Sequence, residues 1–247
     1  MSPSGSSASG SSRGSDSTGS AHRFASIRAP LPGLPSHVTP TRLPSVWIAR
    51  HGETEWSLAG RHTGRTDIDL TPRGETDARR LGERLRVLSF IAIFTSPSRR
   101  AVRTCALAGF GDRAVPDPDL GEWDYGDYEG LRTAEIRTER PTWHLFYDGC
   151  PGGESPSAIG ERADRVVAKV RAIDGDVLLV SSAHLLRVLT ARWLGLPVAA
   201  GQCFVASPAG LGCLGYEHNR SEPAVRLWND TQHLIENHPP AAAPRQP

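Results

Sequence analysis

Three clusters of basic and polar residues each follow a short apolar run that is typical of a buried strand. The clusters at 50–53, 95–100 and 181–187 follow the apolar runs 46–49, 90–94 and 177–180, the last of which lies within a predicted strand over 176–181. Parallel strands bring such ends to one edge of a sheet, which is where ligands bind in open α/β sheets. Arginine and histidine side chains that converge beside helix N-termini predict a site for a dianion such as a phosphoryl group.

His51 is the residue that we predict to be the nucleophile of this site. Its imidazole can accept a phosphoryl group, and the charge of that group would be neutralised by the adjacent Arg50. Gly52 lets the chain turn sharply after the strand and lets a ligand approach the backbone closely. We find no Walker-type lysine loop and no clustered aspartates, so we expect no metal and no cofactor.

Composition limits the protein class. The chain has 247 residues, 38% of them apolar and 22% charged, with a net charge of +1. We expect no nucleic-acid partner, and no membrane partner because no apolar run approaches the ~20 residues that cross a bilayer. Four scattered cysteines without a C-x-x-C pair favour free thiols and a cytoplasmic location.

Both ends of the chain differ from its middle. Residues 1–44 are rich in Ser, Gly and Pro, so we predict a disordered N-terminal segment, followed by a domain over 45–237 and a disordered tail over 238–247. A transit peptide and a start codon assigned too early are the alternatives for the first segment.

Strand and helix patterns alternate within this domain. Thr71 and Pro72 form a helix start, and apolar residues recur at helical spacing from 78 to 88. Further helices are expected from 97, over 131–140 and 156–173, and near 184–194, and two late strands at 211–216 and 224–228. This order predicts an α/β fold, a three-layer α/β/α sandwich with a mostly parallel sheet.

Several motifs in this order resemble the histidine phosphatase, or phosphoglycerate mutase-like, superfamily over roughly residues 45–235. They are R-H-G-E-T-x-W at 50–56, G-R-H-T-G at 60–64, S-P-x-x-R-A at 96–101 and E-W-D-Y-G at 122–126. The last motif and the stretch D-G-C-P-G-G-E-S at 148–155 are most similar to the acid phosphatase and sedoheptulose-bisphosphatase branch.

The resemblance implies a role for individual residues. His51 would form a phosphohistidine, Arg50 and Arg100 would bind the phosphoryl oxygens, and Glu122 would protonate the leaving alcohol and then activate water. Substrate contacts are implied for Thr63, Gly64, Tyr125, Arg187 and His218.

One position departs from the family pattern. The family normally ends its third strand in a His-Gly pair, but here Ser182 and Ala183 stand at those positions, and His184 follows. We place Ser182 and His184 at the phosphate, although loss of a charge-assisted donor commonly costs ~10²–10³ in rate. Three alternatives remain: His184 substitutes in part, the enzyme is slow, or the protein binds phosphate without turnover.

The sequence therefore predicts a metal-independent phosphoric monoester hydrolase that acts through a phosphohistidine on small phosphorylated metabolites such as sugar phosphates. A catalytically impaired pseudo-phosphatase and a phosphoglycerate mutase are the alternatives. The short segment before the third strand disfavours the mutase, because true mutases carry a longer insertion there. A homodimer is left open.

Overall fold

The computed structural model describes residues 42–235. The predicted disordered segments, 1–44 and 238–247, lie outside this range apart from residues 42–44. The strands are β1 Val46–Arg50, β2 Ala92–Thr95, β3 Ala114–Pro116, β4 Val177–Ser181, β5 Leu211–Tyr216 and β6 Pro223–Asp230. The α-helices are α1 Glu55–Leu58, α2 Pro72–Leu85, α3 Arg99–Leu107, α4 Thr133–Glu139, α5 Leu145–Asp148, α6 Pro156–Arg171 and α7 Ala183–Trp193. Short 3₁₀ helices are η1 Pro118–Leu120, η2 Gly126–Tyr128, η3 Val198–Cys203 and η4 Gln232–Leu234.

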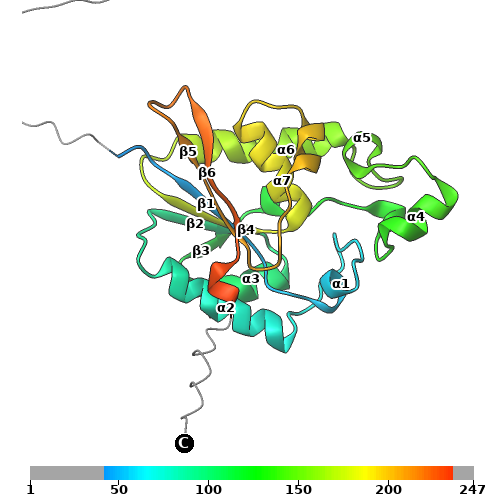
Figure 1. Ribbon diagram of the computed structural model, residues 1–247, viewed down its shortest axis with the longest axis horizontal. Helices are drawn as coiled ribbons and strands as arrows, with labels where there is room; N and C mark the ends of the chain where they lie inside the picture. Colours follow the sequence, from blue (N-terminus) through cyan, green and yellow to red (C-terminus); the bar gives the residue numbers. More distant parts are fainter. Residues whose placement is uncertain (1–41, 236–247) are drawn as a thin grey trace, which may run out of the picture. The chain divides into compact units, whose positions relative to one another are not determined.

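A six-stranded sheet in the order β3-β2-β4-β1-β5-β6 forms the centre of residues 42–235. The first four strands of that order are parallel to one another. At the other side of the sheet, β5 pairs antiparallel with β1, and β6 pairs antiparallel with β5. Helices α6 and α7 cover one face of the sheet, and α2 and α3 cover the other (Figure 1). The predicted α/β/α sandwich with a mostly parallel sheet is confirmed.

Strand β4 is buried over its whole length and divides the core in two. Val177 and Leu179 belong to the cluster that includes residues of α6 and α7. Leu178 and Val180 point to the opposite face and join residues of α2 and α3. A strand that is covered on both faces is apolar throughout, which is why its sequence shows no alternation.

Two strands differ from the predicted elements. The run at 90–94 forms its strand two residues later, as β2, and residues 114–116 form the edge strand β3, where no strand was predicted. Pro116 closes β3, and proline is tolerated at a sheet edge because its missing N–H removes no central ladder bond.

The loop after β1 packs directly against the first turn of α2. A Cβ on Gly52 would lie 2.4 Å from the Gly74 oxygen, and one on Gly74 would lie 2.2 Å from the Glu53 oxygen. Thr71 closes this contact, because its amide donates to the Glu53 carbonyl at 2.9 Å and its hydroxyl to the Glu53 carboxylate at 2.8 Å. Helix α2 therefore braces the segment that carries His51.

We expect Gly74→Ala to destabilise the protein, although alanine favours helix over glycine by about 1 kcal/mol. The added Cβ would displace the backbone of residues 52–53, and such overpacking typically costs ~1–3 kcal/mol. Chemical denaturation would measure the free energy of unfolding. Arg73→Ala, in the same helical turn with a 75% exposed side chain, is the control and should change it by less than about 0.5 kcal/mol. Equal or higher stability of Gly74→Ala would contradict this packing.

Candidate active site

The strand register brings the predicted clusters to one edge of the sheet. Arg50 pairs with Ser181 across β1 and β4, and the His51 amide donates to the Ser181 carbonyl at 2.9 Å. His51 and Ser182 therefore leave the sheet side by side. Strand β2 pairs with the other side of β4 and delivers the N-terminus of α3 to the same edge.

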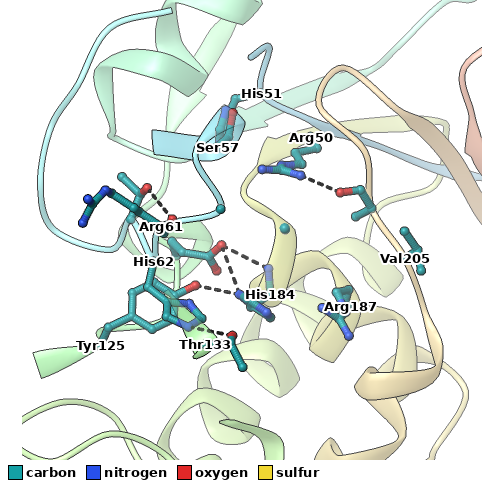
Figure 2. A pocket seen from close by; sticks show the side chains of 15 residues that line it. Arg50, His51, Ser57, Arg61, His62, Tyr125, Thr133, His184, Arg187 and Val205 are labelled. Carbon is teal, nitrogen blue, oxygen red and sulfur yellow. Dashed lines mark hydrogen bonds and ion pairs between the residues drawn. The ribbon is translucent and has the colours of Figure 1, made fainter. Parts of the chain in front are cut away.

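A cavity of about 290 Å³ opens at this edge (Figure 2). The predicted residues that line it are Arg50, His51, Thr63, Glu122, Tyr125, His184 and Arg187. Gly64 instead lines a neighbouring cavity of about 410 Å³, which shares Glu122 with the first. Arg100 and Ser182 are fully buried.

His51 has the protonation state that a nucleophile requires. Its Nδ1 lies 2.7 Å from the Gly52 carbonyl oxygen. A carbonyl only accepts hydrogen bonds, so Nδ1 carries the proton and Nε2 keeps its lone pair. Burial, and then the positive charges of Arg50 and Arg100, hold the pKa of His51 well below its usual value of 6.5. The ring is therefore neutral.

Helix α3 fixes the backbone beside this histidine. The Gly52 amide donates to the Thr104 hydroxyl at 3.0 Å, and that hydroxyl donates to the Arg100 carbonyl at 2.7 Å. Sequence reasoning missed Thr104, although it lies one helical turn after Arg100 on the buried face of α3.

Two arginines beside His51, the half-buried Arg50 and the buried Arg100, leave part of their donors unused. Arg50 donates from Nη1 to the Ala206 carbonyl at 2.7 Å, and burial lowers its pKa. Arg100 donates to three carbonyls within residues 63–66, at 3.0 to 3.1 Å. The Nε–H group of each arginine has no hydrogen-bond partner in the described chain. Unpaired donors on buried cations favour an anion at this place.

Glu122 caps helix α7 from outside the helix. Its Oε1 accepts the amides of Trp123 and Leu185, both at 2.9 Å, and its Oε2 accepts the amide of His184 at 3.0 Å. A carboxylate beside the first turn of a helix is stabilised by the free N–H groups and the helix dipole. Both lone pairs of Oε1 are occupied, so Oε2 is the oxygen left for proton transfer.

Ser182 is the N-cap residue of α7, yet its hydroxyl makes no cap bond. An N-cap hydroxyl normally accepts an amide of the second or third helical residue, and here Glu122 accepts both. The Ser182 Oγ is buried and has no partner among residues 42–235. The hydroxyl is therefore free to bind a ligand.

His184 is held by Tyr125. The Tyr125 hydroxyl lies 2.6 Å from Nδ1 of His184. Burial raises the pKa of Tyr125 well above its usual value. Burial, together with Arg187 and other cationic groups, holds the pKa of His184 well below its usual value. Both groups are therefore neutral, and the tautomer of His184 decides which of them donates the hydrogen bond.

Arg187 reaches the cavity but is also tied to the chain. It donates to the Gly201 and Gln202 carbonyls at 3.1 and 3.2 Å, and its guanidinium lies 4.6 Å from the centre of the Phe146 ring. It lines the cavity beside Val205 (Figure 2).

His218 does not reach the cavity, contrary to the prediction. It lies in the connection between β5 and β6, its side chain is 77% exposed, and it pairs with Glu222 at 2.7 Å. Strand β5 is antiparallel to β1, so this connection lies at the end of the sheet opposite His51.

Several residues of the site were missed by sequence reasoning. His62 is buried, stacks on Tyr125 with ring centres 4.7 Å apart, and has its pKa lowered by burial to about 4. Its place in the G-R-H-T-G motif was the available signal. Arg162 in α6 binds the Glu154 carboxylate and donates to the Glu122 carbonyl at 3.2 Å. It thereby fixes the segment that presents Glu122, and nothing local in the sequence marks this role.

Within residues 42–235, no group of three or more His, Cys, Asp or Glu side chains could hold a metal ion. None of the helices in the same range is long and apolar enough to span a bilayer.

A buried neutral imidazole flanked by arginines at the carboxyl edge of an α/β sheet is an arrangement suited to phosphoryl transfer. The sequence matches the model of the histidine phosphatase superfamily (branch 1) over residues 46–231, and the chain belongs to this family. The predicted family is thus confirmed.

Relatives and solved structures agree with this assignment. The chain is 42% identical to an acid phosphatase of Mycobacterium tuberculosis, over 72% of this chain and 89% of that protein. It is 34% identical to a sedoheptulose 1,7-bisphosphatase of Saccharomyces cerevisiae, over 76% and 93% of the two chains. The solved structure of the product of a Mycobacterium tuberculosis open reading frame matches with a TM-score of 0.73 at 40% sequence identity. The match covers 76% of this chain and 98% of that chain. The solved structure of a mycobacterial glucosyl-3-phosphoglycerate phosphatase matches with a TM-score of 0.67 at 27% sequence identity, over 76% of this chain and 99% of that chain. The predicted phosphatase class is confirmed.

We expect the His51 ring to remain neutral when the pH falls to 6.5, because its pKa lies well below that usual value. If the neutral ring is the nucleophile, as the sequence predicts, the acid limb of kcat/KM that belongs to His51 should lie below pH 6.5. An NMR titration of the ring, assigned with His51→Gln, would measure this. His218 is an internal control, because Glu222 raises its pKa above 6.5. A titration midpoint of His51 at or above that of His218 would contradict a lowered pKa of His51.

Proposed function

We propose that this phosphatase hydrolyses phosphomonoesters of small metabolites through a phosphohistidine at His51, without a metal ion. The observation that carries the proposal is a set of three buried, unpartnered groups beside the imidazole: Arg50 Nε, Arg100 Nε and Ser182 Oγ. Each can donate a hydrogen bond to a phosphoryl oxygen. Together they offer two positive charges and three donors next to a neutral nucleophile.

The chemistry would proceed in two steps. The Nε2 lone pair of His51 attacks phosphorus, the ester P–O bond breaks, and Glu122 gives the proton on Oε2 to the leaving alcohol. Water then attacks the phosphohistidine, Glu122 takes a proton from it, and the N–P bond breaks to release phosphate. The arginines stabilise the charge on the equatorial oxygens in both steps.

Size and polarity favour a sugar phosphate as the substrate. A cavity of about 290 Å³ is at the small end of the ~300–1,000 Å³ that is usual for ligand sites. Its walls carry hydrogen-bonding groups, among them Thr63, Thr133 and His184. Two of the similar proteins act on sugar phosphates by their names, a sedoheptulose 1,7-bisphosphatase and a glucosyl-3-phosphoglycerate phosphatase.

We expect the wild-type protein to hydrolyse an aryl phosphate at full rate in excess chelator, because arginines supply the charge that a metal ion supplies elsewhere. His51→Ala should lower kcat by at least ~10³-fold, and rapid acid-free quenching of the wild type should trap an acid-labile phosphoprotein. Loss of the activity in chelator would contradict the metal-free mechanism. Activity of His51→Ala equal to the wild type would contradict the nucleophile.

We expect Ser182→His to raise kcat, because an imidazolium would add a charge-assisted donor that is commonly worth ~10²–10³ in rate. The same aryl phosphate assay measures this, with Ser182→Ala as the matched control that removes the free hydroxyl and should lower kcat. If the wild type is no faster than His51→Ala while Ser182→His is active, the protein is a phosphate-binding pseudo-phosphatase. A Ser182→Ala rate equal to the wild type would show that this hydroxyl does not contact the phosphoryl group.

A further inference from the structure

The two nitrogens of His184 have different surroundings. Nδ1 lies 2.6 Å from the Tyr125 hydroxyl, whereas Nε2 makes no hydrogen bond within the described chain. The side chain is 19% exposed and lines the cavity. Figure 2 shows the His184 ring at the cavity wall, between Tyr125 and Arg187.

The hydrogen bond to Nδ1 is the only one that the buried Tyr125 hydroxyl makes within residues 42–235, so the hydroxyl proton is paired there only if Tyr125 donates it. A neutral imidazole carries one proton, and a nitrogen that accepts a hydroxyl proton cannot also carry one. Tyr125 therefore places the proton of His184 on Nε2, the nitrogen that is free for a ligand. The Tyr125 ring is itself fixed, because it is 1% exposed and stacks on His62.

The position of His184 points to the leaving group of the substrate. Its amide donates to Oε2 of Glu122, and its Nδ1 lies 4.0 Å from the same oxygen. Glu122 acts at the oxygen that joins phosphorus to the alcohol, so His184 lies beside the alcohol part. A neutral N–H donor in such a place suits a hydroxyl oxygen, whereas the charged phosphoryl group lies among the arginine donors.

We propose that Tyr125 locks His184 as an Nε2–H donor to a hydroxyl oxygen of the substrate, which makes the enzyme selective for polyhydroxylated phosphomonoesters. The proposal rests on the phosphatase function above and extends it to substrate recognition. It also replaces the sequence-based expectation that His184 binds phosphate. Tyr125 is then a positioning residue that acts through His184.

Kinetics with two kinds of substrate would test this recognition. The quantity is the ratio of kcat/KM for a sugar phosphate, ribose 5-phosphate or glucose 6-phosphate, to kcat/KM for phenyl phosphate, which has no hydroxyl groups. Tyr125→Phe should lower this ratio on the order of tenfold, the usual value of one hydrogen bond in a buried site. Tyr128→Phe is the matched control, because its hydroxyl accepts from Arg140 at 3.1 Å away from the cavity. It should leave the ratio unchanged.

Two substitutions of His184 separate its nitrogens. Asparagine can keep an acceptor near the position of Nδ1 but has no donor at that of Nε2, whereas the longer glutamine can place its amide nitrogen near Nε2. His184→Asn should therefore lower the ratio as much as Tyr125→Phe, and His184→Gln should retain more of it. An unchanged ratio in both Tyr125→Phe and His184→Asn would overturn the proposal.

The tautomer has a readout that does not depend on turnover. Nitrogen-15 NMR of the histidine rings distinguishes the two neutral tautomers, and the wild type should show the His184 proton on Nε2. Tyr125→Phe should lose this preference, whereas Tyr128→Phe should keep it. A proton on Nδ1 in the wild type would overturn the lock.

A failure of the proposed function can be told apart from a failure of this recognition. If the wild type hydrolyses neither substrate, binding of the same sugar phosphates and of phenyl phosphate is measured by calorimetry. The ratio of their dissociation constants should then change in the same variants. An unchanged binding ratio would overturn the recognition, whereas a changed ratio without turnover would overturn hydrolysis alone.

Discussion

The contact between the Glu122 carboxylate and the first turn of α7 is the interaction on which the rest of the site depends. One side chain takes the amides of His184 and Leu185. As a result, it caps the helix, leaves the Ser182 hydroxyl unbonded and places Oε2 at the cavity. The same carboxylate thus caps the helix and is the group that we propose for proton transfer. A substitution of Glu122 would alter the helix start as well as the chemistry, so its effect on rate could not be assigned to proton transfer alone.

The arginines of this site also lower the stability of the folded protein. The half-buried Arg50 and the buried Arg100 have no acidic partner within hydrogen-bond distance in the described residues, and the buried Nε–H group of each is unbonded. Burial of an incompletely paired charge costs several kcal/mol in ordinary proteins. The backbone carbonyls of Ala206 and of residues 63–66 offset part of this cost. An anion that binds only the folded form would offset more, and its stabilisation grows with concentration over Kd. The same unpaired donors therefore lower the stability of the folded protein and favour the binding of an anion.

Sequence patterns were sufficient for the fold and for residues whose place follows from a strand end. Arg50 ends β1 and His51 follows it directly, and a parallel register then brings Ser182 beside them. Patterns were insufficient where the partner is distant. Tyr125 and His184 are 59 residues apart, and their bond depends on how the segment before η2 packs against the first turn of α7. His218 was misplaced for a related reason. The two strands on either side of His218 were predicted correctly from the sequence. The direction of β5 is set by its antiparallel pairing with β1, and this direction places the connection between β5 and β6 far from His51.

In the proposed mechanism, the serine at position 182 would have two opposing effects on the reaction. It would remove a cationic donor from the transition state, and we expect this to lower the rate by the factor that a charge-assisted bond is worth in a dry site. It also leaves one fewer positive charge near His51, whose basicity is already reduced by Arg50 and Arg100. A more basic imidazole is a better nucleophile, but nucleophilicity follows basicity only fractionally, as for thiols with a slope of about 0.4–0.5. We therefore expect the loss at the transition state to be the larger effect. The unpartnered Ser182 hydroxyl would restore one hydrogen bond to the phosphoryl group, but without the positive charge.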